Sequence, residues 1–155
     1  MVITGTALAV LGAAIAAFVA GAGSIIGVGN SGNVAAGILS EKPELFGKLL
    51  PLQLLPGTQG IYGFLVAFMI WFRFVGAATP ISVATGLQVI LAALPVALAG
   101  LHSGPWQGAV SVSSMHMVAK QPDSSGRAMM LPAMVETYAI LGLLISVLLV
   151  FRIQP

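Results

Sequence analysis

The sequence contains no cysteine and very little charge. Only 6% of its 155 residues are Asp, Glu, Lys or Arg, whereas a soluble domain carries about 25%. The lack of cysteine excludes disulfides, thiolate metal sites and thiol catalysis, and the lack of charge argues against a compact soluble enzyme. The net charge of +2 comes from scattered residues, so the chain has no basic cluster that would bind nucleic acid.

Long apolar stretches make up most of the chain, in which 58% of the residues are hydrophobic. No charged residue occurs at positions 1–40, 49–72 or 74–119, and positions 128–151 contain only Glu136. A helix needs roughly 20 predominantly apolar residues to cross a bilayer, so each stretch is long enough. The composition predicts an all-α, multi-pass membrane protein with four transmembrane helices in the lipid bilayer.

Three polar segments divide these stretches, at positions 41–44, 76–80 and 120–127. Each combines charged or turn-forming residues with proline, a composition that favours chain reversal. We therefore predict two helical hairpins, with helices at approximately 4–39, 45–72, 81–119 and 127–151. The first and third helices exceed the hydrocarbon thickness, so they should tilt or project beyond it.

The two halves of the chain repeat each other. One constant shift along the sequence places Gly21 on Gly100 and Arg73 on Arg152, and a slightly shorter shift places Tyr62 on Tyr138. We predict a first hairpin at 1–78 and a second hairpin, carrying Glu136, at 79–155. Because repeated units need not bury all their faces within one chain, we expect identical subunits to assemble into a homo-oligomer.

The first helix is rich in glycine, which lets neighbouring helix backbones approach closely. Residues 27–32 also spell the dinucleotide-binding pattern GxGxxG, but an apolar helix precedes it instead of a strand, so we interpret these glycines as packing residues. In a ring, the glycine-rich helices would occupy the crowded inner radius. The second and fourth helices carry Leu, Phe, Ile and Val, which suit contact with lipid.

The basic residues predict how the chain lies in the cell membrane. Four of them flank the two hairpin loops, whereas Arg73 and Arg152 lie at the opposite ends of the helices. The four are Lys42, Lys48, Lys120 and Arg127. The positive-inside rule places the hairpin loops in the cytoplasm and both termini outside.

Glu136 lies near the middle of the last predicted helix. An ionised carboxylate there costs at least a few kcal/mol, and acidic residues within membrane segments are functional by default. The sequence places no Lys or Arg at that depth. Glu136 must therefore be protonated, paired or bound to a cation.

Other polar residues should reach the same depth as Glu136. Thr58 and Gln59 follow the Pro56-Gly57 pair in the second helix, and Gln107 lies midway along the third. A proton needs only the carboxylate, whereas a bare Na⁺ needs several oxygens. Hydroxyl and amide side chains and a carbonyl near the proline kink are able to supply them. Tyr62 lies one turn further on, and its hydroxyl is suited to donate a hydrogen bond to the carboxylate.

Residues 54–64, with the sequence LLPGTQGIYGF, and residues 135–142, with the sequence VETYAILG, resemble the proteolipid, or rotor-ring, subunit of V-type ATPases. The likeness runs over essentially the whole chain and is greatest to the four-helix K subunit of bacterial Na⁺-translocating enzymes. In the long form of that family, the hairpin is duplicated and one carboxylate is kept. The first half of this chain has none, because Gly60 occupies the position that corresponds to Glu136 in the repeat. The resemblance implies that Na⁺ is bound by Glu136, Gln59, Thr58, Gln107 and the Leu55 carbonyl, with Tyr62 closing the site.

This resemblance implies a ring that turns against a membrane stator subunit with a half-channel, while the cytoplasmic loops meet a central-stalk subunit. The chain itself is then non-catalytic and needs no cofactor, since nothing in it resembles a P-loop or another nucleotide site. The transported ion is Na⁺, or alternatively H⁺.

Two other classes of function fit part of the sequence. A small four-helix, proton-coupled transporter of organic cations would use one membrane glutamate, but such a site favours aromatic residues around the acid. A purely structural proteolipid or pore former would leave the polar set without a purpose. His102 and His116 have no acidic neighbour in the sequence, and we interpret them as packing or interface residues.

Overall fold

A computed structural model describes residues 4–76 and 80–154. Within these ranges, four helical stretches are long and apolar enough to cross a membrane, which confirms the predicted fold class. The elements are α1 (Gly5–Glu41), η1 (Pro43–Leu45), α2 (Phe46–Leu54), η2 (Leu55–Gly57), α3 (Thr58–Ile70), η3 (Trp71–Val75), α4 (Val83–Lys120), η4 (Pro122–Ser124) and α5 (Ser125–Arg152). Residues 77–79 of the predicted middle loop, and the predicted hairpin boundary at 78, lie outside the described residues.

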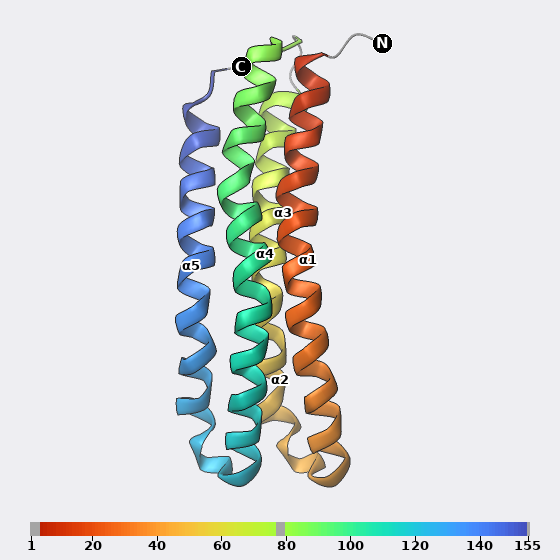
Figure 1. Ribbon diagram of the computed structural model, residues 1–155, viewed down its shortest axis with the longest axis vertical. Helices are drawn as coiled ribbons and strands as arrows, with labels where there is room; N and C mark the ends of the chain where they lie inside the picture. Colours follow the sequence, from red (N-terminus) through yellow and green to blue (C-terminus); the bar gives the residue numbers. More distant parts are fainter. Residues whose placement is uncertain (1–3, 77–79, 155) are drawn as a thin grey trace.

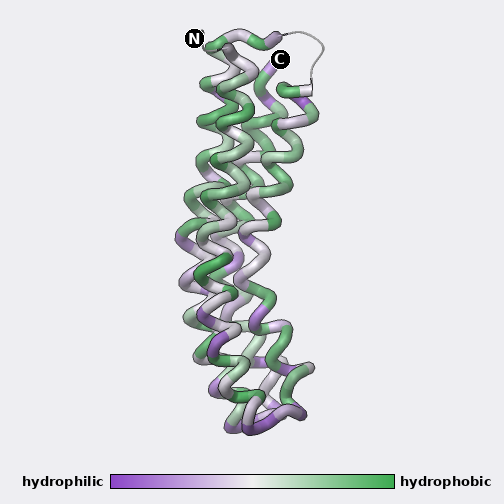
Figure 2. Tube along the Cα trace, turned by 90° about the vertical axis from the view of Figure 1, so that its right-hand side faces the viewer, coloured by the Kyte–Doolittle hydropathy of each residue, from purple (hydrophilic) through white to green (hydrophobic). Residues whose placement is uncertain are grey.

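The helices lie side by side along one long axis (Figure 1). Both hairpin turns are at one end of the bundle, and the ends of α1 and α5 that lead to the chain termini are at the other. Figure 2 shows hydrophilic residues gathered at the end with the hairpin turns. Helices α1 and α4 have 37 and 38 residues, or about 56 Å at 1.5 Å per residue. Both therefore exceed the roughly 30 Å hydrocarbon core, as expected from the sequence.

Glycines allow the backbones of α1 and α4 to pack in direct contact. A Cβ added at Gly108 would lie 2.5 Å from the Gly27 Cα, and one added at Gly104 would lie 2.5 Å from the Gly23 carbonyl carbon. Only glycine permits this approach, which matches the small-residue packing of membrane helices. The GxGxxG segment lies inside the continuous helix α1, in agreement with its interpretation as packing.

The second and fourth spans cover the α1–α4 pair. Gly63 of α3 packs against Ala16 and Ala20 of α1, and Gly142 of α5 packs against α4 in the same manner. The outward surfaces of α3 and α5 are strongly apolar: exposed residues include Phe64, Phe68, Leu144 and Leu148. Such a surface is suited to lipid.

Basic side chains connect the two hairpins at their ends. The Lys42 ammonium donates to the Ala119 carbonyl at 2.6 Å, and the Lys48 ammonium donates to the Pro122 carbonyl at 3.0 Å. At the opposite end, the Arg73 guanidinium donates to the Phe151 carbonyl at 3.3 Å and to the Ile153 carbonyl at 3.0 Å. These basic side chains therefore bind backbone carbonyls at the two ends of the bundle, and they lie far from Glu136 along the helix axes.

Candidate ion-binding site

The predicted range 45–72 implied one continuous α-helix, but the second span of the structure is interrupted. Pro56 lacks an amide hydrogen and its ring disturbs the preceding turn, and the chain tightens into a 3-10 turn at Leu55–Gly57. The Leu55 carbonyl there accepts hydrogen bonds from the Thr58 amide and from the Thr58 hydroxyl, the latter at 2.9 Å. The break thus places the Leu55 and Thr58 oxygens side by side.

Two glutamines meet in the interior of the bundle. Gln59 of α3 and Gln107 of α4 are completely buried, and the Gln59 amide nitrogen donates to Gln107 Oε1. The Gln107 amide nitrogen donates to the Pro132 carbonyl of α5 at 3.0 Å and contacts Glu136 Oε2 at 3.4 Å. This chain of amides joins α3, α4 and α5 at one level.

Pro105 and Trp106 directly precede Gln107 without displacing it. Helix α4 continues through Pro105, and Trp106 is 70% exposed while Gln107 is fully buried. The bulky indole therefore lies on a different face of α4 from the glutamine, which reaches the position that the sequence predicted.

The Glu136 carboxylate has neutral partners. The Tyr62 hydroxyl donates to Oε1 at 2.5 Å, and the Gln107 amide contacts Oε2. Glu136 itself is half-buried near the middle of α5. A hydroxyl and an amide do not cancel a negative charge, so at this depth the carboxylate requires a proton or a cation.

One buried oxygen in this cluster is left without a partner. Among the described residues, Gln59 Oε1 is buried and accepts no hydrogen bond. An unsatisfied buried acceptor costs about 1–3 kcal/mol, and such groups call for an explanation such as an unseen water or ion. A buried amide oxygen without a partner, linked through Gln107 to a carboxylate, is the arrangement expected of a cation site.

The donor set fits a cation of single charge. The oxygens at hand are neutral apart from those of Glu136, and within residues 4–76 and 80–154 no three His, Cys, Asp or Glu side chains gather. One carboxylate balances one positive charge, and hard oxygen ligands suit alkali and alkaline-earth ions rather than soft metals. Of the six residues singled out from the sequence, the structure connects Gln59, Gln107, Glu136 and Tyr62 by side-chain contacts. It places the other two, Leu55 and Thr58, against each other in the turn that precedes Gln59.

Two supporting contacts were not predicted. The Pro132 carbonyl positions the Gln107 amide, and the Ser24 hydroxyl of α1 accepts from the Gly60 amide at 2.8 Å. A signal for the first existed, because Pro132 aligns with Pro56 in the internal repeat. Ser24 also aligns with Ser103 in the repeat, but its contact with Gly60 depends on how closely α1 approaches α3, which the sequence does not show.

Comparison with known proteins identifies the family. The family model for the C subunit of ATP synthase matches residues 11–70 and again residues 90–149. The two matches begin at positions 11 and 90, and this separation is the same shift that places Gly21 on Gly100. The chain therefore contains the family's helical hairpin twice.

Two relatives cover most of the chain. It is 47% identical over 148 residues to the V-type sodium ATPase subunit K of Enterococcus hirae, a match that spans 96% of this chain and 93% of the relative. It is 40% identical over 142 residues to the A-type ATP synthase subunit K of Methanocaldococcus jannaschii, spanning 92% of this chain and 61% of that relative. The chain therefore belongs to the family of the ATP synthase C subunit and is similar to the K subunits of V-type and A-type enzymes.

Proposed function

We propose that copies of this chain form the rotor ring of a rotary V-type ATPase and that each copy carries one Na⁺ on Glu136. The observation that carries this proposal is a cluster of hydrogen-bonded side chains. In it Glu136, whose partners among the described residues are neutral, is linked through Gln107 to Gln59, and the buried Oε1 of Gln59 has no partner. The ligands would be the Glu136 carboxylate, the amide oxygens of Gln59 and Gln107, the Thr58 hydroxyl and the Leu55 carbonyl.

The number of oxygens favours Na⁺ over H⁺. A proton would need only the carboxylate, and the buried glutamine pair and the 3-10 turn would then serve no purpose in transport. The relative from Enterococcus hirae, named a sodium ATPase subunit, is 47% identical. This similarity supports the same ion here.

In the proposed cycle, bound Na⁺ neutralises Glu136, so the loaded site can face lipid as the ring turns. The Tyr62 hydroxyl, 2.5 Å from Oε1, holds the carboxylate in place. At a stator subunit, an aqueous half-channel and a fixed cation release the ion. Moving each charge against the membrane potential costs about 2.3 kcal/mol per 100 mV, which ATP hydrolysis in separate, soluble subunits supplies.

We place the hairpin turns in the cytoplasm and both termini outside, because basic residues flank those turns. The turns around Lys42 and Lys120 are then the surface that meets the central stalk. The contacts of Glu136 favour this ring over a transporter of organic cations, since a hydroxyl and an amide contact the carboxylate where cation binding would favour aromatic ring faces.

Protection from carbodiimide modification tests the proposal. The reagent attacks the protonated carboxyl of Glu136, and a bound Na⁺ should shield it. At fixed pH, the labelling rate of the assembled protein should fall about tenfold once Na⁺ is about ten times its Kd, while K⁺ at the same ionic strength should leave the rate unchanged. Equal labelling rates in Na⁺ and K⁺ would favour H⁺ as the transported ion.

A further inference from the structure

Charged side chains are distributed unequally between the two ends of the bundle. The end with the hairpin turns carries four basic residues and three of the four acidic ones. The fourth acidic residue, Glu136, lies near the middle of α5. The opposite end (Figure 1) carries Arg73 and Arg152 and none of the acidic residues. No acidic side chain therefore balances these two positive charges.

Arg73 lies at the depth of the lipid headgroups. The 14 residues from Gln59 to Arg73 cover about 21 Å at about 1.5 Å per residue, and half of the hydrocarbon core is about 15 Å thick. Because the ion site lies near the middle of the membrane, the guanidinium reaches the membrane interface. Trp71, two residues earlier, is 53% exposed, as expected of a tryptophan at that interface.

Neutral groups hold the Arg73 guanidinium in place. Its Nη2 donates to the Phe151 and Ile153 carbonyls at the end of α5, and its central carbon lies 5.7 Å from the ring centres of Phe74 and Phe151. Within the described ranges, its buried Nε has no acceptor. The partial negative charge of a helix C-terminus offsets only about half of a positive charge. Part of the charge of Arg73 therefore stays without a partner.

An apolar groove of about 370 Å³ leads to this guanidinium between the second span and α5. We call it the Arg73 groove, and its lining residues are Phe68, Met69, Phe72, Arg73, Val150 and Phe151. The three phenylalanines are more than half exposed, and the ring centres of Phe68 and Phe72 lie 4.5 Å apart. Phe68 lies closer to the middle of the membrane than Arg73. The groove thus joins a hydrocarbon surface to a cation, in the direction in which a phospholipid joins its acyl chains to its phosphate.

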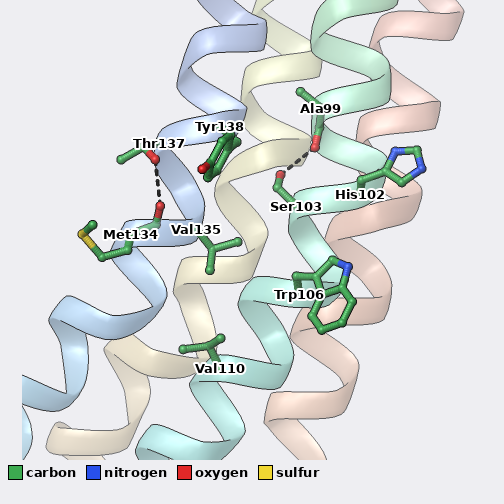
Figure 3. Close-up of a pocket in the computed structure, with 9 residues that line it drawn as sticks. All are labelled: Ala99, His102, Ser103, Trp106, Val110, Met134, Val135, Thr137 and Tyr138. Carbon is green, nitrogen blue, oxygen red and sulfur yellow. Dashed lines mark hydrogen bonds between the residues drawn. The ribbon is translucent and has the colours of Figure 1, made fainter.

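Another groove of the bundle lacks this combination. A groove of about 650 Å³ between α4 and α5 (Figure 3) is lined by His102, Trp106 and Tyr138 among apolar side chains. None of its described lining residues is an Asp, Glu, Lys or Arg. It therefore offers no fixed charge to a phosphate, and the Arg73 groove is the better candidate for a charged lipid.

We propose that the Arg73 groove binds an anionic phospholipid, with the phosphate on the guanidinium and an acyl chain along Phe68 and Phe72. The hydrogen bonds to protein carbonyls come from Nη2, so Nη1 donates to the phosphate, and a charge-assisted bond of this kind is strong. Arg152 at the same end adds to the attraction for anionic lipid. The inference requires only that the chain lies in a bilayer, and it depends on neither the ring nor the transported ion.

Quenching of Trp71 fluorescence tests the proposal. The full chain with Trp106→Phe keeps Trp71 as its single tryptophan, and it is placed in phosphatidylcholine vesicles with rising fractions of brominated phosphatidylglycerol or brominated phosphatidylcholine. Bromine quenches tryptophan at short range, so the two curves give the relative affinity of the two lipids. We expect phosphatidylglycerol to bind about fivefold more tightly. Arg73→Gln in the same background should bring this ratio close to one.

Arg127→Gln is the matched control, because it removes the same charge from an exposed position at the hairpin end. The preference for phosphatidylglycerol should then stay about fivefold. Arg73→Lys guards against a folding defect: it keeps the positive charge but not the paired bonds to the two carbonyls, so at least half of the preference should remain. Equal binding of the two lipids when Arg73 is present, an equal loss in Arg127→Gln, or no preference in Arg73→Lys would overturn the lipid site. None of these results would alter Na⁺ protection of Glu136, so the proposed function would stand.

Discussion

ATP-driven Na⁺ uptake into vesicles should fall to background when Glu136 is replaced by glutamine in the complete enzyme, while the ring still assembles. Glutamine has nearly the same size and still accepts a hydrogen bond from the Tyr62 hydroxyl, so packing between α3 and α5 is kept. It carries no negative charge, and a bare cation in a low-dielectric interior is strongly unfavourable without one. Uptake of radioactive Na⁺ and particle imaging of the purified ring measure the two effects.

Glu44→Gln is the matched control for this experiment. Glu44 lies exposed in η1 at the hairpin turn, so the substitution removes one negative charge without touching the membrane interior. Uptake should then remain close to that of the natural enzyme. Uptake retained by Glu136→Gln would remove this residue from the transport cycle.

Gln59→Leu is expected to weaken Na⁺ binding about tenfold to hundredfold. The substitution removes the unpartnered Oε1 and also the amide that donates to Gln107 Oε1. Loss of one buried polar interaction costs about 1–3 kcal/mol, and each 1.4 kcal/mol corresponds to a factor of ten in affinity. The Na⁺ concentration that half-protects Glu136 from a carbodiimide measures this change.

Gln88→Leu serves as its control, because Gln88 is exposed on α4 and lies outside the amide cluster. The half-protecting concentration should stay the same for this variant. If Gln59→Leu also left it the same, Gln59 would have a packing role and the cation would be held by other groups.

The spans and the site residues could be predicted for one physical reason, the cost of polar groups in a bilayer. The uncharged stretches and the proline-containing turns between them predict a first helix at 4–39. The structure agrees closely, with α1 at Gly5–Glu41. The same cost makes each polar residue at mid-depth informative, and it singles out Glu136, Gln59 and Gln107, which the structure connects by side-chain contacts.

Details set by tertiary packing were beyond such reasoning. The π-helical turn η3 at Trp71–Val75 ends the second span where Arg73 reaches the carbonyls of Phe151 and Ile153, a contact between residues distant in sequence. The outward position of Trp106 likewise depends on which face of α4 packs against α1. Hydropathy and spacing do not determine either feature.

Equilibrium binding of radioactive Na⁺ to the purified ring tests the central claim most directly. We predict saturable binding of one Na⁺ per chain, displaced by unlabelled Na⁺ but not by K⁺, and absent from the Glu136→Gln ring. Absence of saturable binding in the natural ring, or binding that survives Glu136→Gln, would contradict the assignment of Glu136 and its neighbouring oxygens as the Na⁺ site.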